Sequence, residues 1–141
     1  DGVHLGQSDM APDDARKLLG ERAIIGCTAN TFEQIQKIAQ SSADYIGLGP
    51  FRYTTTKKNL APLLGVEGYT RIMQQMAEAG IRLPLVAIGG ITLEDVPQIM
   101  ACGVNGLAIS GSISHAADVT FTTAQFVAKI AQHRTVIMPK S

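Results

Sequence analysis

Short apolar runs alternate with amphipathic stretches along the chain. The runs are about five residues long and consist mostly of Ile, Val, Leu, Ala and Gly, with few polar residues between them. Continuous apolar runs of this length predict strands of a parallel sheet that is covered on both faces. Strands are expected at residues 1–7, 23–28, 45–48, 83–88 and 107–109.

The stretches between these runs carry apolar residues at helical spacing. Pro12 with two acids after it predicts a helix start, because proline loses no needed N–H there and acids complement the helix dipole. Gly20 would cap the same helix at its end. Thr31 and Gln34 have the spacing of a capping box. Helices are expected at about residues 12–19, 31–39, 66–79 and 122–132, with one more after Thr92.

This alternation of strands and helices with short connections indicates the α/β class. Two architectures compete, an open doubly wound sheet and a TIM (β/α)₈ barrel. No G-x-G-x-x-G follows any of the runs, so the dinucleotide-binding fold loses its main support. Glycine-containing runs at residues 88–91 and 109–113 end the last two expected strands. Barrel enzymes commonly bind phosphate at those positions, which favours the barrel.

If these are strands seven and eight, the five expected strands are strands 4–8 of a barrel. A complete barrel takes roughly 200 residues or more, and this chain has 141. We therefore expect residues 1–141 to be the C-terminal five-eighths of a single barrel domain. An intact, small five-stranded open sheet is the alternative, but it would not explain a first residue that lies inside a strand.

Composition is that of a globular domain, with 45% hydrophobic and 17% charged residues. Twelve basic and twelve acidic residues balance, which gives no support for a nucleic-acid or membrane-surface partner. No apolar run reaches membrane-spanning length and no signal peptide is evident. Cys27 and Cys102 have no metal-type spacing, so a reducing cytoplasm is the expected compartment.

The stretch from Gly47 to Lys58 carries the densest chemistry in the sequence. A short strand ends at Gly49-Pro50, and three threonines and two lysines follow within five residues, at positions 54–58. Lysine supplies a point charge and hydroxyls supply donors, so this loop suits phosphate. The competing interpretation is a solvated polar loop with no ligand.

Four motifs together resemble the thiamine phosphate synthase family. They are D-G-V-H-L-G-Q-S-D at residues 1–9, G-L-G-P followed by T-T-T-K-K at 47–58, I-G-G-I at 88–91 and I-S-G-S-I at 109–113. The resemblance implies a transferase of thiamine biosynthesis. Such an enzyme joins an aminopyrimidine methyl diphosphate to a thiazole ethyl phosphate, carboxylated or plain, and releases diphosphate. These two phosphorylated molecules would be its partners, and Mg²⁺ its cofactor.

The resemblance also implies roles for single residues. Asp9 matches a magnesium ligand, and Thr28 matches a contact to the diphosphate. Lys57 matches the lysine that binds the diphosphate and would act in catalysis by stabilising the leaving group. The thiazole phosphate would contact a set of residues in three loops. That set is Thr54, Thr55, Thr56, Gly90, Ser110 and Gly111.

Two groups of residues that the family carries on its second and third strands have no counterpart here, among them a second magnesium aspartate. Residues 1–141 alone are therefore expected to have negligible synthase activity. Exposed strand edges would favour a homo-oligomer or require an N-terminal segment. A thiazole tautomerase of the same scaffold, or an inactive barrel fragment, remains an alternative.

Three residues have plainer interpretations from the sequence alone. His4 lies inside a strand and is expected to pack or to form hydrogen bonds. Cys27 is expected to be a small buried side chain, since no histidine partners it in sequence. Asp9 by itself would be a loop acid or an N-cap.

Overall fold

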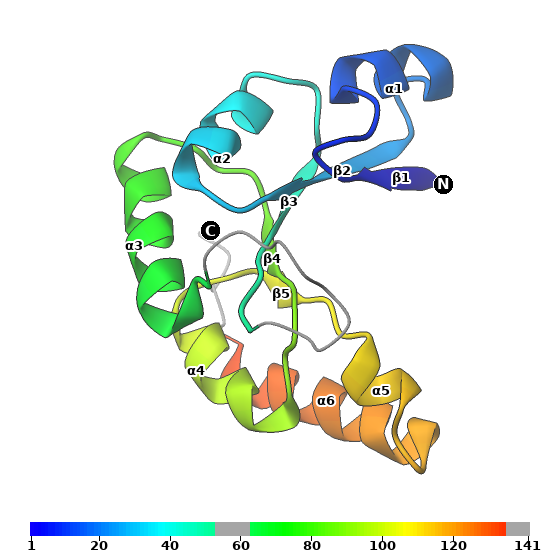
Figure 1. Cartoon of the computed structure of the whole chain (residues 1–141), viewed down its shortest axis with the longest axis vertical. Helices are drawn as coiled ribbons and strands as arrows, with labels where there is room; N and C mark the ends of the chain where they lie inside the picture. The colour runs from blue at the N-terminus through cyan, green and yellow to red at the C-terminus, as the bar shows by residue number, and fades with distance from the viewer. Residues whose placement is uncertain (53–62, 135–141) are drawn as a thin grey trace, which may run out of the picture.

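Five parallel strands form one curved sheet, and the helices form an arc around its convex side (Figure 1). The structure is a computed structural model that describes residues 1–52 and 63–134. In chain order its elements are β1 (Gly2–Leu5), α1 (Pro12–Leu19), β2 (Ile24–Ala29), α2 (Phe32–Ala39), β3 (Tyr45–Leu48), α3 (Gly65–Glu78), β4 (Leu85–Ala87), a 3₁₀ turn (Leu93–Asp95), α4 (Val96–Ala101), β5 (Gly106–Leu107), α5 (Gly111–Ser114) and α6 (Val119–His133).

The strands lie side by side in the order of the sequence, β1-β2-β3-β4-β5, and every neighbouring pair is parallel. Parallel crossovers are right-handed, so a sheet that always steps in one direction keeps its helices on one side. A doubly wound sheet reverses direction at a switch point and carries helices on both faces. The observed order therefore confirms the α/β class and is the order of a (β/α) barrel.

The apolar core lies between the convex face of the sheet and the helices. Ile25, Ile46 and Leu85 are fully buried on three neighbouring strands, and Tyr69 on α3 is fully buried against the sheet. The Tyr69 hydroxyl donates a hydrogen bond to the carbonyl of Leu48, at the end of β3. Burial raises the pKa of the Tyr69 phenol far above its ordinary value. The phenol therefore stays a hydrogen-bond donor.

Local signals place the first two helices as predicted. Helix α1 begins at Pro12 and ends at Leu19, with Gly20 at a φ of 93°. The Thr31 side chain accepts a hydrogen bond from the Gln34 N–H, which is one half of the capping box. The other half does not form. The Gln34 side chain instead accepts from the N–H of Asn30 and bonds to Gln7.

Other boundaries differ from the prediction for local reasons. Helix α6 begins at Val119, three residues before the expected start, because the Asp118 side chain accepts from the Phe121 N–H and acts as N-cap. The segment after Thr92 starts as a 3₁₀ turn before α4 follows. Strands β4 and β5 are shorter than expected and end at Ala87 and Leu107.

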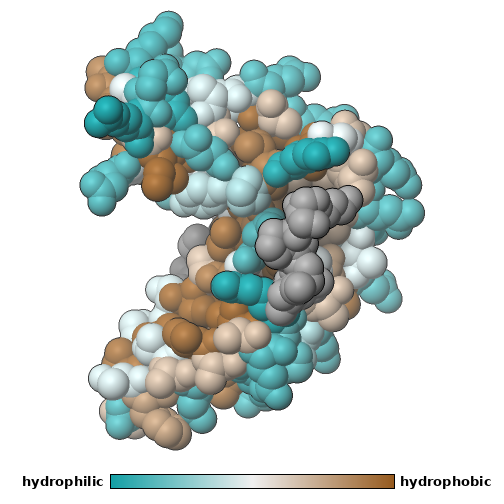
Figure 2. All heavy atoms as spheres, turned by 180° about the vertical axis from the view of Figure 1, so that it is seen from behind, coloured by the Kyte–Doolittle hydropathy of each residue, from teal (hydrophilic) through white to brown (hydrophobic). Residues whose placement is uncertain are grey.

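The sequence predicts a sheet covered on both faces, but in the described residues the concave face is open. A hollow of about 590 Å³ lies on this face, and Figure 2 shows the molecule hollowed between two lobes. Gly26 leaves room on this face for the Tyr45 ring, which a Cβ at position 26 would overlap. Within the described ranges no helix covers this face. The hollow is lined by His4, Thr28, Tyr45, Gly47, Val86, Ile88 and Ala108.

Candidate active site

Every predicted site residue that the structure describes lies at the carboxyl edge of the sheet. Asp9 is in the loop after β1, Thr28 is near the end of β2, Gly90 follows β4, and Ser110 and Gly111 follow β5. Because the strands are parallel, their carboxyl ends share one edge, where α/β proteins bind ligands. Thr54, Thr55, Thr56 and Lys57 lie outside the described residues. Their predicted roles stay predictions.

The turn after β4 contacts the start of α5. The Ser112 hydroxyl donates a hydrogen bond of 2.7 Å to the carbonyl of Ile91. Gly89 and Gly90 have φ values of 93° and 66°, which glycine adopts without strain. Within residues 1–52 and 63–134 the N–H groups of Gly89, Gly90 and Ile91 have no hydrogen-bond partner. Such N–H groups in a glycine turn suit an anion.

Arg52, in the segment after β3, connects this turn to the 3₁₀ turn that precedes α4. The Arg52 guanidinium bonds both oxygens of Asp95, with Nη1 to Oδ2 at 2.6 Å and Nη2 to Oδ1 at 2.9 Å. Nη1 also donates to the Gly90 carbonyl at 2.9 Å. Burial alone raises the pKa of the Asp95 carboxyl, but hydrogen bonds from Arg52 and Thr92 outweigh burial and hold that pKa below its ordinary value. Asp95 is therefore an anion at neutral pH.

Acid should weaken this pair. Because folding lowers the Asp95 pKa, the carboxylate contributes stability above its unfolded pKa near 3.8, and that contribution is lost as pH falls through the folded value. We expect Asp95→Asn to lower the free energy of unfolding by about 1–3 kcal/mol at pH 7. The difference from the unsubstituted protein should shrink towards pH 3. Urea unfolding at pH 7, 5 and 3 measures this difference, with Glu21→Gln at an exposed position as the control. A difference that does not change with pH would contradict the conclusion that ionised Asp95 stabilises the fold.

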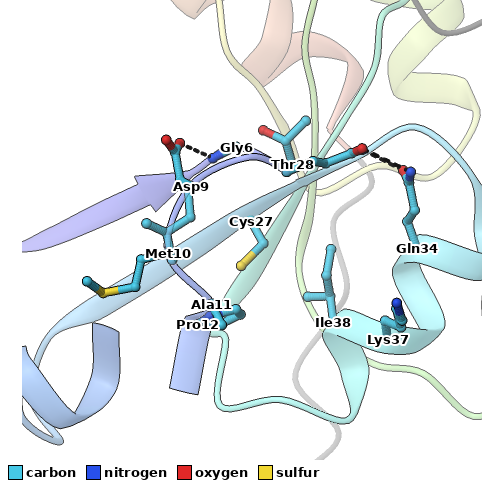
Figure 3. Close-up of a pocket in the computed structure, with 12 residues that line it drawn as sticks. Gly6, Asp9, Met10, Ala11, Pro12, Cys27, Thr28, Gln34, Lys37 and Ile38 are labelled. Carbon is cyan, nitrogen blue, oxygen red and sulfur yellow. Dashed lines mark hydrogen bonds between the residues drawn. The ribbon is translucent and has the colours of Figure 1, made fainter. Parts of the chain in front are cut away.

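The loop after β1 borders a second cavity, of about 390 Å³, and Figure 3 shows Asp9 among the residues that line it. Asp9 Oδ2 accepts the N–H of Gly6 at 2.7 Å, which folds the loop back on itself. Oδ1 has no hydrogen-bond partner among the described residues. One exposed carboxylate oxygen suits Mg²⁺, which keeps several waters and takes few protein ligands. Across the described ranges, however, no three His, Cys, Asp or Glu side chains gather into a metal-binding group.

Sequence reasoning missed a polar cluster on the concave face. His4 Nδ1 bonds the Tyr45 hydroxyl and His4 Nε2 bonds the Thr28 hydroxyl, each at 2.8 Å. His4 therefore forms the hydrogen bonds expected of it, but it is exposed beside the hollow and not packed in a core. Alternation within the strand was the available signal, because Val3 and Leu5 flank His4. The sequence-based prediction treats the strands as uniformly apolar and so gives His4 no polar partners on one face.

Cys27 lies on β2 beside the cavity near Asp9 and is buried, as expected. Burial raises the pKa of its thiol. The thiol therefore stays protonated at neutral pH and is a poor nucleophile.

The sequence profile of a protein family described as thiamine monophosphate synthase matches residues 1–113. The chain belongs to this family. The thiamine monophosphate synthase match covers β1 to the first residues of α5, and so includes Asp9, Thr28, Gly90, Ser110 and Gly111.

Curated relatives carry the same description. The thiamine-phosphate synthase of Bacteroides thetaiotaomicron is 64% identical over 118 residues, which are 84% of this chain and 56% of that protein. The thiamine-phosphate synthase of Flavobacterium johnsoniae is 54% identical over 114 residues, or 81% of this chain and 54% of that protein. This member of the family thus spans about half the length of the relatives it matches.

Solved structures support the fold. A thiamine phosphate pyrophosphorylase from Pyrococcus furiosus superimposes with a TM-score of 0.81 at 28% identity, over 94% of this chain and 60% of that one. A 3-hexulose-6-phosphate synthase superimposes with a TM-score of 0.65 at 16% identity, over 92% of this chain and 62% of that one. At that identity the second likeness concerns the fold alone.

None of the helices in residues 1–52 and 63–134 combines the length and apolar character needed to cross a bilayer.

Proposed function

We propose that this chain supplies most of the active site of a thiamine phosphate synthase. The reaction would join an aminopyrimidine methyl diphosphate to a thiazole ethyl phosphate and release diphosphate. The observation that carries the proposal is the contact of the Gly89–Ile91 turn with the start of α5, through Ser112, at the carboxyl edge of the sheet in a chain of this family. Free thiols at Cys27 and Cys102 accord with a cytoplasmic enzyme.

The phosphate of the thiazole substrate would bind at that junction. Gly90, Ser110 and Gly111 would surround it with backbone N–H groups and a hydroxyl, since Gly111 begins α5. Thr54, Thr55 and Thr56 would complete the site from the loop after β3. Close approach of the backbone is possible because the turn has glycines at two successive positions.

The diphosphate of the pyrimidine substrate would bind nearer to β1 and β2. Asp9 would hold Mg²⁺, which when bound offsets negative charge on the diphosphate. Thr28 would donate its hydroxyl to a phosphoryl oxygen, and Lys57 would place its ammonium group on the leaving diphosphate. These donors act most strongly as the carbon–oxygen bond breaks, because negative charge then grows on the leaving group.

No protein nucleophile is required for this reaction. The bond from the pyrimidine methylene to oxygen breaks with its electron pair going to diphosphate, and the thiazole nitrogen supplies the pair for the new bond. The electron-rich aminopyrimidine can delocalise positive charge at the methylene in between. The chain would then act mainly by holding both substrates in line. The protonated, buried Cys27 is consistent with this account.

We further propose that the five strands correspond to strands 4–8 of a (β/α)₈ barrel. The chain covers 56% and 60% of two longer proteins of this description. In the described residues β1 and β5 each pair on one side only. On the edge strand β1 the apolar side chain of Val3 is 37% exposed. Residues 1–141 alone should accordingly show negligible synthase turnover; a rate like that of a full-length relative would overturn this proposal.

Calorimetric binding of the pyrimidine diphosphate to the complete gene product tests the proposed function. We expect binding that needs Mg²⁺ and that Asp9→Asn weakens about tenfold or more, with Asp14→Asn as the exposed control. A tautomerase of the same scaffold would bind the thiazole phosphate but show no metal-dependent binding of the diphosphate. That result would replace the synthase proposal with the tautomerase.

A further inference from the structure

Arg52, in the segment after β3, contacts the turn after β4 through both its backbone and its side chain. The Arg52 N–H donates to the Gly89 carbonyl at 2.9 Å. Its own carbonyl oxygen lies 2.5 Å from where a Cβ at Gly90 would sit, so this backbone packs directly against the turn. The guanidinium then reaches the Gly90 carbonyl and Asp95. Arg52 therefore contacts the turn on two sides.

Asp95 forms hydrogen bonds with Thr92, the residue that directly follows the same turn. Its Oδ2 accepts from the Thr92 N–H at 2.7 Å and from the Thr92 hydroxyl at 2.9 Å. The carboxylate is buried, with 7% of the residue exposed. A buried carboxylate needs its ionic partner to offset desolvation. The Arg52–Asp95 pair is thus bonded both to Gly90 within the Gly89–Ile91 turn and to Thr92 directly after it.

This pair leaves the N–H side of the turn available. The Gly90 carbonyl is held by Arg52, and the N–H groups from Gly89 to Ile91 have no partner within the described ranges. A peptide plane held at its oxygen has a fixed direction for its N–H, because the peptide unit is planar. The Arg52 guanidinium already donates three hydrogen bonds, two to Asp95 and one to the Gly90 carbonyl. Arg52 is thereby suited to orient the turn.

We propose that Arg52 is a positioning residue that, through its pair with Asp95, orients the Gly89–Ile91 turn for the phosphate of the thiazole substrate. This inference rests on the proposed function. It predicts that loss of Arg52 weakens phosphate binding at this turn selectively and leaves binding of the diphosphate, for which Asp9 and Thr28 lie near β1 and β2, nearly unchanged. A purely structural arginine would affect both sites alike or neither.

Arg16 provides a matched control. It also pairs with a carboxylate, Asp44, at 2.8 Å and donates to loop carbonyls at Ala23 and Ser42. These partners precede β2 and β3 and so lie at the amino edge of the sheet. Arg16→Gln therefore removes a comparable ion pair at the edge away from the candidate site.

The experiment is calorimetric binding of thiazole ethyl phosphate, inorganic phosphate and the pyrimidine diphosphate with Mg²⁺ to the complete gene product. For Arg52→Gln we expect Kd to rise about tenfold or more for the first two ligands and less than about threefold for the diphosphate. Arg52→Lys should lie between, because an ammonium group cannot bond two carboxylate oxygens in the same way. Arg16→Gln should lower Tm and change no Kd by more than about threefold.

Three results would overturn the proposal. These are an unchanged Kd for both thiazole ethyl phosphate and inorganic phosphate in Arg52→Gln, an equal loss of affinity for all three ligands in Arg52→Gln, or a selective loss of affinity for the first two ligands in Arg16→Gln. If Arg52→Gln does not fold, Arg52→Lys is judged by the same selectivity. A wild type that binds inorganic phosphate but not thiazole ethyl phosphate refutes the proposed function, while inorganic phosphate still decides the role of Arg52. A wild type that binds neither refutes both.

Discussion

Lys57→Ala in the complete gene product should lower turnover of the pyrimidine diphosphate by about 10²–10³, the usual effect of removing one donor to a developing negative charge. The Kd for thiazole ethyl phosphate should change by less than about threefold. The reason is that Lys57 would meet the diphosphate as it leaves, whereas the threonines before it would meet the other substrate. Steady-state kinetics and calorimetry on one preparation measure the two effects.

Lys58→Ala is the matched control for this prediction, because it removes the same charge one residue further along. It should leave turnover within about threefold of the unsubstituted enzyme. Equal losses of turnover and of thiazole phosphate affinity in Lys57→Ala would show that the loop is not divided between two ligands. Equal losses of turnover in Lys57→Ala and Lys58→Ala would show that Lys57 contributes only general positive charge.

Gly90→Ala should weaken thiazole phosphate binding and also destabilise the fold. A side chain at a φ of 66° is strained, and the new Cβ would lie 2.5 Å from the Arg52 carbonyl oxygen. We expect the free energy of unfolding to fall by about 1–3 kcal/mol and the Kd to rise at least about tenfold. Urea unfolding and calorimetry measure the two quantities.

Gly80→Ala is the control that distinguishes the effect of backbone strain from the effect of crowding at the site. Its φ is 72°, and no atom lies within 4 Å of the Cβ that alanine would add. Gly80→Ala should therefore lose about 1 kcal/mol of stability and bind thiazole phosphate normally. If Gly90→Ala binds as well as Gly80→Ala, the turn after β4 is not the phosphate site.

Much of the fold follows from local signals in the sequence. Pro12 and Gly20 mark both ends of α1, and Tyr45–Leu48 marks β3, because turn residues and short apolar runs act locally. The predicted helix boundaries are wrong where a single side chain determines the first residue of the helix. Asp118 starts α6 early through one hydrogen bond, and nothing in the hydrophobic spacing distinguishes it from other loop acids.

The site was only partly predictable for a different reason. Glycine runs and the loop after β1 could be placed, because parallel strands bring their carboxyl ends together. The Arg52–Asp95 pair joins residues 43 positions apart in the sequence. The two residues come together because β3 and β4 pair in a particular register. Likewise, His4 meets Tyr45 across β2. Such pairs depend on tertiary structure, which spacing in one sequence does not specify.

One measurement tests the central claim most directly: formation of thiamine phosphate by the complete gene product from the pyrimidine diphosphate and thiazole ethyl phosphate, followed by chromatography. The proposal predicts equal amounts of thiamine phosphate and diphosphate, only with both substrates and Mg²⁺ present, and a loss of at least about tenfold in Asp9→Asn. A folded complete protein that binds both substrates yet forms no thiamine phosphate would contradict it.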